Sequence, residues 1–354
     1  MTPSLAWTPH GFDDWRRHFP VTPFAQPAGK LDWTARFIAC WERPALRLPR
    51  DTVVVLVSGL YSEWLPRCHR DAARALRGAG YRVLRIPVRS SRGVMAQATH
   101  IGATLRAHLS DGQRFIALTH SKGGIDTLAA LAADPALCAR CDGIALVQPP
   151  VGPASVVDEI LGWGPAAAMS TTPGSWSPAT QTPTTPPSTC PATSTSPTPR
   201  TEIPLHDRIG ARLLRSRWLA DGTRDISSRR DPRVATMLAN LPPGLHSVHA
   251  ISWSIERSSR FDTFHARLDA RRPGCAHDGQ FYLEDQVLAG VPQICLPRLD
   301  HGQPVLGGLG FDSGRFWLAL ADLLHASRPT STGEPDRSDE VDFEAGDTGI
   351  RASS

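Results

Sequence analysis

The stretch from Ile116 to Ala133 constrains the fold of this chain more than any other segment. An apolar run breaks at Ser121, Gly123 and Gly124 and then continues into an alanine- and leucine-rich segment. This pattern predicts a β-strand, a sharp turn at the serine and an α-helix, because small residues let a strand and a helix approach closely. The free amides of the first helical turn would face the same serine. The segment therefore predicts a serine nucleophile and an anion site at one turn.

Apolar strand patterns alternate with helical patterns along much of the chain. The run at 53–57 is apolar at every position, which is typical of a central strand buried on both faces. Strands separated by helices of this length imply a parallel sheet with helices on both sides. The further strands are predicted at 81–86, 115–119, 144–148, 246–255 and 293–296, and the helices at 68–79, 94–109, 125–133, 205–219 and around 316–324.

Two further residues follow the serine in an order that suggests a catalytic triad. Asp278 lies in His-Asp-Gly at 277–279, and His301 lies in Leu-Asp-His-Gly at 299–302. The order serine, acid, histidine and the sequence His-Ser-Lys-Gly-Gly at 120–124 resemble bacterial α/β-hydrolases of the esterase and lipase type. The resemblance covers roughly residues 50–325. The chain departs from the family pattern at Thr119, which replaces a glycine, and at Gln280, which replaces an apolar residue.

The resemblance implies an α/β-hydrolase fold with a mostly parallel central sheet, helices on both faces and an irregular cap insertion. It also implies a serine hydrolase of carboxylic esters that acts through an acyl-enzyme. Ser121 would attack the carbonyl, His301 would act as the base, and Asp278 would orient the imidazole. The oxyanion would be bound by the backbone amides of Lys122 and Leu60, with Tyr61 the next candidate. No metal or organic cofactor is implied.

Several neighbouring residues compete for these roles. Asp262, Asp269 and Asp285 are alternative acids, because a long stretch precedes Asp278. Asp300 adjoins the histidine and is expected to orient its loop. His120 is expected to pack or hydrogen-bond beneath the turn, and the side chain of Lys122 is expected to be solvated.

Two other functions fit the same residues. A catalytically weak or inactive member of this fold would bind a ligand or partner without turnover. An acyltransferase or thioesterase would use the same triad and differ only in the acceptor or the leaving group. We therefore expect a small-molecule ester substrate first, with these two alternatives open.

The chain divides by composition into five parts. Residues 165–201 hold 26 Pro, Ser or Thr among 37 residues, so this stretch is predicted to be a surface insertion of the cap or a segment translated out of frame. The predicted parts are an irregular N-terminal arm with aromatic anchors at 1–50, the first part of the core at 51–150, the cap at 151–245, the second part of the core at 246–327, and a disordered acidic tail at 328–354.

Charge and cysteine content point to few further partners. The net charge of +4 is small and scattered over 354 residues, which argues against a nucleic-acid partner. No stretch is long and apolar enough to span a bilayer. The basic amphipathic helix predicted at 205–219 could act as a lid that touches a lipid interface transiently. The preferred interpretation is that it is simply a helix of the cap. Seven cysteines without an export signal favour reduced thiols in the cytoplasm, and the pair Cys138 and Cys141 is expected to pack rather than bind metal.

Overall fold

The computed structural model describes nine stretches of the chain. They are residues 7–10, 15–22, 27–44, 48–49, 51–163, 204–217, 219–254, 263–308 and 310–328. The proline-, serine- and threonine-rich stretch at 165–201, the predicted tail from 329 onward and the alternative acid Asp262 lie outside the described residues.

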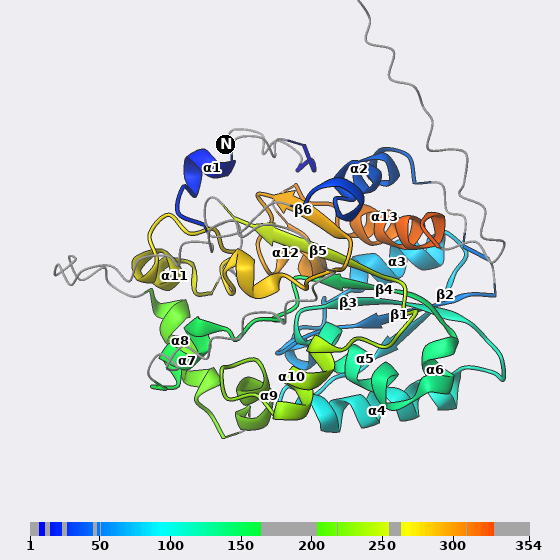
Figure 1. The fold of residues 1–354 in the computed structure, drawn as a ribbon, viewed down its shortest axis with the longest axis horizontal. Coiled ribbons are helices and arrows are strands. Elements are labelled where there is room, and N and C mark those ends of the chain that lie inside the picture. The colour runs from blue at the N-terminus through cyan, green and yellow to red at the C-terminus, as the bar shows by residue number, and fades with distance from the viewer. Residues whose placement is uncertain are drawn as a thin grey trace, which may run out of the picture.

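A six-stranded sheet forms the centre of the molecule (Figure 1). The strand order is β2-β1-β3-β4-β5-β6, and each neighbouring pair is parallel. The strand predicted to begin at 144 begins at Cys141, because Cys141 pairs with the start of β3. The strands are β1 Val53–Val57, β2 Arg82–Ile86, β3 Phe115–His120, β4 Cys141–Val147, β5 Ser247–Trp253 and β6 Gln293–Pro297.

Helices cover both faces of this sheet, as the alternating sequence pattern predicts. One face packs against α2 (Thr34–Glu42), α3 (Arg70–Gly78), α12 (Gln303–Leu306) and α13 (Ser313–Ala326). The other face packs against α4 (Val94–His108), α5 (Lys122–Ala133), α6 (Pro135–Ala139) and α10 (Pro232–Ala239). In Figure 1 the two layers lie above and below the strands.

The side chains of β1 show why the central strands are apolar at every position. Val54 and Leu56 belong to the hydrophobic core that contains Phe316, whereas Val53 and Val55 belong to the core on the other face. Successive strand residues point to opposite sides, so a strand covered on both faces requires apolar residues throughout.

The N-terminal arm differs from the irregular segment that the sequence predicts. Residues 34–42 form α2, which packs on α13 through the contact between Phe37 and Phe316, with ring centroids 5.7 Å apart. The predicted aromatic anchoring to the main body is confirmed for Trp7, which packs edge-on against Phe311 with ring centroids 4.8 Å apart. The prolines and glycines that flank α2 led to the prediction of an irregular segment, whereas tertiary contacts stabilise a helix there.

Four short helices gather at one end of the sheet in Figure 1. They are α7 (Ser155–Ile160), α8 (Leu205–Leu214), α9 (Ala220–Asp225) and α11 (His265–Arg271); the remaining helix, α1, is Trp15–His18. The helix predicted at 205–219 ends at Leu214, so the predicted C-terminal end of this helix was wrong. Apolar residues of α7, α8 and α11 form their own core with Leu60 and Tyr61, which places this cap beside the loop after β1.

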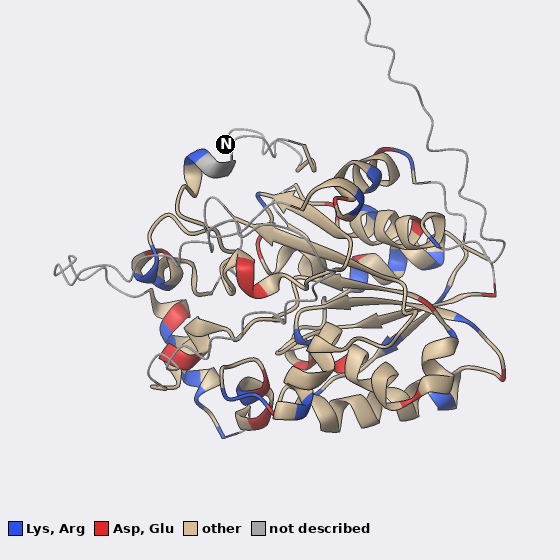
Figure 2. Cartoon of the chain, viewed as in Figure 1, with Lys and Arg blue, Asp and Glu red and all other residues tan. Residues whose placement is uncertain are grey.

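In Figure 2 the Lys and Arg residues are interspersed with Asp and Glu residues along the described part of the ribbon. Among the described helices, none is long and apolar enough to cross a membrane.

Candidate active site

The predicted nucleophile lies where the winding of the sheet reverses. From β1 the chain crosses to β2 on one side, and it then returns to β3 on the other side of β1. The loops after β1 and β3 therefore diverge and leave a crevice at the carboxyl ends of the two strands, which is where ligands bind in such sheets. Ser121 follows β3 directly, and Gly59 lies in the loop after β1.

Ser121 occupies a strained backbone conformation between β3 and α5. Its φ of 55° and ψ of −138° lie outside the regions that non-glycine residues prefer. The strain brings α5 onto the loop after β1: a Cβ at Gly123 would stand 2.4 Å from the carbonyl oxygen of Ser58. This position therefore requires glycine, and the sharp turn predicted from the sequence is present.

Thr119 fits at the position where the family pattern has glycine. Its hydroxyl donates a hydrogen bond to the carbonyl oxygen of Ala145 on β4, at 2.7 Å. The space beside it comes from Gly124, where a Cβ would stand 3.1 Å from the Thr119 hydroxyl. Threonine in place of glycine at position 119 is therefore accommodated by this hydrogen bond and by the small size of Gly124.

His301 and Asp278 form a buried pair. The Asp278 Oδ2 and His301 Nδ1 atoms lie 2.7 Å apart, and the His301 amide donates to the Asp278 carbonyl at 2.8 Å. The other carboxylate oxygen accepts the amides of Gln280 and Phe281 at 2.9 and 2.8 Å. These bonds fix the carboxylate, which leaves His301 Nε2 as the imidazole atom available for other chemistry.

The turn after Asp278 explains the departure at Gln280. Gly279 has a φ of 88°, so only glycine fits the turn comfortably. The apolar contact that the family pattern places after the glycine comes one residue later, because Phe281 packs edge-on against the His301 ring at 5.0 Å. Sequence reasoning missed Phe281, although an aromatic residue three positions after the acid was a usable signal.

The alternative acids that the structure describes lie elsewhere. Asp269 bonds to His265 and His277; burial opposes its ionisation, but these hydrogen bonds outweigh burial and lower its pKa. Asp285 packs against Gly152, and burial raises its pKa well above the usual range.

Asp300 orients the histidine loop, as expected. Its Oδ1 accepts the amides of Gly302 and Gln303, both at 2.8 Å. The carboxylate therefore serves the backbone of the loop that carries His301.

His120 is hydrogen-bonded, as the sequence predicts, and one of its partners is the backbone of His301. Its Nε2 lies 2.8 Å from the carbonyl oxygen of His301 and 3.1 Å from Oε1 of Gln148. Two acceptors at one nitrogen require that Nε2 carries the proton. Burial, with the nearby His301, lowers the pKa of His120 well below 6.5, so this ring stays neutral and fixes the backbone of the histidine loop.

Of the three backbone amides predicted to bind the oxyanion, those of Lys122 and Leu60 are available, whereas that of Tyr61 already donates a hydrogen bond. The Lys122 amide opens α5 and has no partner within the helix, and no acceptor for the Leu60 amide is found among the described residues. Tyr61 was a wrong candidate, because its amide donates to the Ser90 hydroxyl at 2.5 Å. The close approach of Gly59 brings these two amides to one place.

The Lys122 side chain is buried, which contradicts the expectation that it is solvated. Its ammonium lies 2.7 Å from Oδ1 of Asp126, one helical turn on, and both side chains are about 3% exposed or less. Burial raises the pKa of Asp126 to about 6, against the lowering effect of Lys122. This ion pair stabilises the first turn of α5, directly after Ser121.

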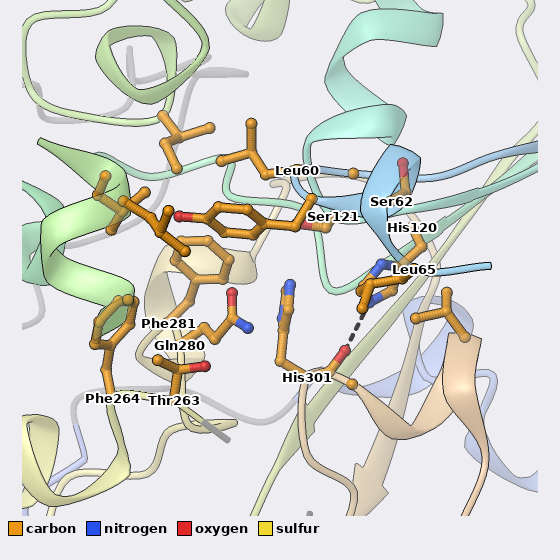
Figure 3. Close-up of a pocket in the computed structure, with 18 of the residues that line it drawn as sticks. Leu60, Ser62, Leu65, His120, Ser121, Thr263, Phe264, Gln280, Phe281 and His301 are labelled. Carbon is orange, nitrogen blue, oxygen red and sulfur yellow. Dashed lines mark hydrogen bonds between the residues drawn. The ribbon is translucent and has the colours of Figure 1, made fainter. Parts of the chain in front are cut away.

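Ser121 and His301 open onto one apolar cavity of about 360 Å³. In Figure 3 the His301 ring points toward Ser121, with Phe281 and Gln280 beside it. Sequence reasoning did not identify the rest of the wall, because it is assembled from cap helices far along the chain. The cap side chains that line it are Val156 and Val157 of α7, Ile209, Leu213 and Leu214 of α8, and Ile226 and Phe264.

Gly210 holds α8 against this cavity. A Cβ at Gly210 would stand 2.5 Å from the side chain of Thr263 and 3.2 Å from Phe264. Three apolar residues of α8 are exposed, Leu205, Ile209 and Leu213, at 69%, 52% and 39% exposure, and the last two also line the cavity. The helix therefore lines the cavity and also presents an apolar stripe to solvent.

Comparison with known proteins identifies the fold. No protein-family model matches the chain, and no curated protein matches its sequence significantly. The structure is similar to that of a metagenomic carboxyl esterase, with a TM-score of 0.53 and 18% identity over 79% of this chain and 77% of that chain. It is also similar to a Bacillus licheniformis lipase in its mature form, with a TM-score of 0.52 and 15% identity over 78% of this chain and 93% of that chain. The chain has the α/β-hydrolase fold, as its sequence predicts.

Proposed function

We propose that this chain is a serine hydrolase of carboxylic esters that acts through an acyl-enzyme. The observation that carries the proposal is the buried hydrogen bond from His301 to Asp278 beside a strained Ser121, with both serine and histidine on one cavity. The similarity to a carboxyl esterase and a lipase supports the same conclusion at the level of the fold.

In the first half of the reaction, His301 Nε2 takes the proton of Ser121 as its hydroxyl attacks the ester carbonyl. The imidazolium that forms is stabilised by Asp278, whose second oxygen is already held by two amides. The tetrahedral oxyanion is bound by the amide of Lys122 at the start of α5 and by the amide of Leu60 in the loop after β1. His301 then protonates the leaving alcohol, and an acyl-enzyme remains.

In the second half, His301 removes a proton from water, which attacks the acyl-enzyme and releases the carboxylic acid. An alcohol or thiol in place of water would give acyl transfer, and a thioester in place of the ester would give thioesterase activity. The apolar wall formed by α7 and α8 supports a substrate whose acyl part is a hydrocarbon chain, because burial of each methylene is favourable by about 0.8 kcal/mol.

The test is hydrolysis of p-nitrophenyl butyrate by the full chain, compared with Ser121→Ala and with Ser62→Ala. Ser62 also lines the cavity but has no place in the triad, so it is the matched control. Ser121→Ala is expected to lose activity about 10³-fold or more with the thermal midpoint unchanged. Folded wild-type protein without activity, and without labelling of Ser121 by a fluorophosphonate, would instead support a non-catalytic binding protein.

The apolar stripe on α8 supports transient contact with a lipid surface as an extension of this function. Leu205, the most exposed of the three residues, does not line the cavity. Leu205→Asp is therefore expected to weaken sedimentation with phosphatidylglycerol vesicles and to leave hydrolysis of soluble p-nitrophenyl butyrate unchanged. Equal sedimentation of both proteins would contradict the lipid contact.

A further inference from the structure

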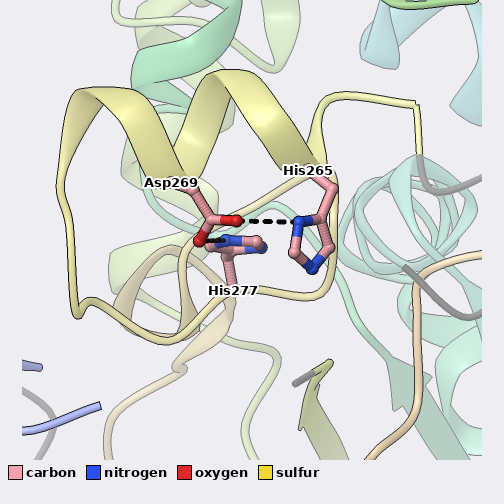
Figure 4. Close-up of side chains that lie close together, drawn as sticks. All are labelled: His265, Asp269 and His277. Atoms are coloured by element: carbon pink, nitrogen blue, oxygen red, sulfur yellow. Dashed lines mark hydrogen bonds and ion pairs between the residues drawn. The ribbon is translucent and has the colours of Figure 1, made fainter. Parts of the chain in front are cut away.

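Two histidines and one aspartate meet outside the site described above. His265 and Asp269 lie one turn apart on α11, and His277 lies on the segment that leads to Asp278 (Figure 4). His265 Nδ1 is 2.9 Å from Asp269 Oδ2, and His277 Nε2 is 2.9 Å from Asp269 Oδ1. One ligand atom from each residue lies within 4.8 Å of the other two.

This spacing suits a tetrahedral cation. Zn²⁺ binds imidazole nitrogen and carboxylate oxygen at about 2.0–2.2 Å, so neighbouring ligand atoms in a tetrahedron stand about 3.3 Å apart. The two nitrogen–oxygen separations of 2.9 Å are slightly shorter than this, so binding requires the Asp269 carboxylate and the two rings to move apart. His277 is fully buried and Asp269 is half exposed, which leaves a fourth position on the solvent side for water.

The charges around α11 also favour a cation at this point. The other carboxylates packed here each pair with an arginine: Asp207 and Glu159 with Arg267, and Glu284 with Arg272. Asp269 instead accepts hydrogen bonds from two imidazoles. Its negative charge is not matched by a guanidinium in the part of the chain that the structure describes.

We propose that His265, Asp269 and His277 form a zinc site that is coupled to the turn carrying Asp278. Two imidazoles and one carboxylate prefer Zn²⁺ over Mg²⁺, which takes oxygen ligands. The proposal stands on this geometry alone and does not depend on the proposed esterase activity.

The coupling follows from the proton on His277. The amide of Gly279 donates to His277 Nδ1 at 3.2 Å, so the ring accepts there and carries its proton on Nε2, facing Asp269. Zn²⁺ on Nε2 displaces this proton to Nδ1, where it meets the Gly279 N–H. Two donors repel each other, so the bond breaks and the turn from Gly279 to Phe281, which holds Asp278, loosens.

Binding is tested by titrating the full chain with ZnCl₂ in an isothermal calorimeter and by measuring the number of bound ions with native mass spectrometry. We expect one Zn²⁺ per chain, no binding of Mg²⁺, and at least a tenfold weaker affinity in His265→Asn and in Asp269→Asn. His108→Asn on α4 is the matched control and should bind as the wild type does. Absence of stoichiometric binding, or equal affinity in all variants, would overturn the site.

The coupling is tested by hydrogen–deuterium exchange, which does not require activity. Zn²⁺ is expected to raise exchange in the peptide that contains Gly279 and Phe281 and to leave α4 unchanged. The rise should be absent in Asp269→Asn. Zinc binding with unchanged exchange in this peptide would overturn the coupling.

Discussion

The backbone of Gly59 lies directly against Ser121. A Cβ at position 59 would stand 2.6 Å from the Ser121 Cβ and 2.9 Å from its hydroxyl oxygen. It would also stand 3.2 Å from the Lys122 amide, in the space where the oxyanion is expected to bind. The loop after β1 thus forms one wall of the proposed reaction centre.

Gly59→Ala should therefore damage catalysis. The added methyl group displaces the serine and blocks the oxyanion position, so we expect kcat for p-nitrophenyl butyrate to fall about 10²-fold or more. Gly78→Ala on α3 is the matched control, since a Cβ there meets nothing within 4 Å. Equal activity of Gly59→Ala and the wild type would contradict the placement of the oxyanion.

Asp278→Asn should lower kcat about 10⁴-fold, because an amide cannot stabilise the imidazolium and favours the wrong tautomer. Asp269→Asn changes one of the alternative acids and should leave kcat within about twofold in metal-free buffer. Steady-state kinetics with both variants decide between the two acids. A larger loss in Asp269→Asn would reverse the assignment.

Leu214→Trp should shift the acyl preference toward shorter chains. Leu214 is buried on α8 and lines the cavity, so a larger side chain removes space for the substrate. We expect the ratio of kcat/KM for octanoate over acetate esters to fall about tenfold or more. Leu205→Trp changes an exposed residue of the same helix and should keep the wild-type ratio.

The Asp126 carboxyl should give stability a distinct pH dependence. Its pKa is raised from 3.8 to about 6 in the folded chain, so the folded state holds this proton more tightly than the unfolded state. The contribution to stability is fully present below about pH 4 and is lost as the pH rises through 6. Urea unfolding of the wild type and Asp126→Asn should show a difference that varies over this window, and a constant difference would contradict the shift.

Zn²⁺ should inhibit ester hydrolysis if both proposals hold, because a loosened turn no longer fixes Asp278. We expect kcat to fall severalfold in saturating ZnCl₂ and to recover with a chelator. His265→Asn should retain the metal-free activity and resist the inhibition. Inhibition of His265→Asn to the same extent would place the effect at another site.

Much of the proposed centre could be predicted from the sequence because its signals are local. The strand, Ser121, two glycines and the helix follow one another within 18 residues, and backbone sterics alone require small residues at such a turn. The hydrogen-bonding role of His120 and the orienting role of Asp300 in the histidine loop could be predicted for the same reason. By contrast, the burial of Lys122 was not predictable, since it depends on how other elements cover the first turn of α5.

The sequence by itself determined the alternating architecture, the Ser121 turn and the order of Asp278 and His301, because these depend on residues close together in the chain. Only the tertiary structure decided which aspartate meets His301, which amide after β1 is available, and which side chains line the cavity. Those contacts join residues from separate elements: Asp278 and His301 lie on either side of β6 in the chain, and Ser121 and Leu306 line one cavity. Hydrophobic burial determines them, and it acts on the whole chain rather than on any short segment.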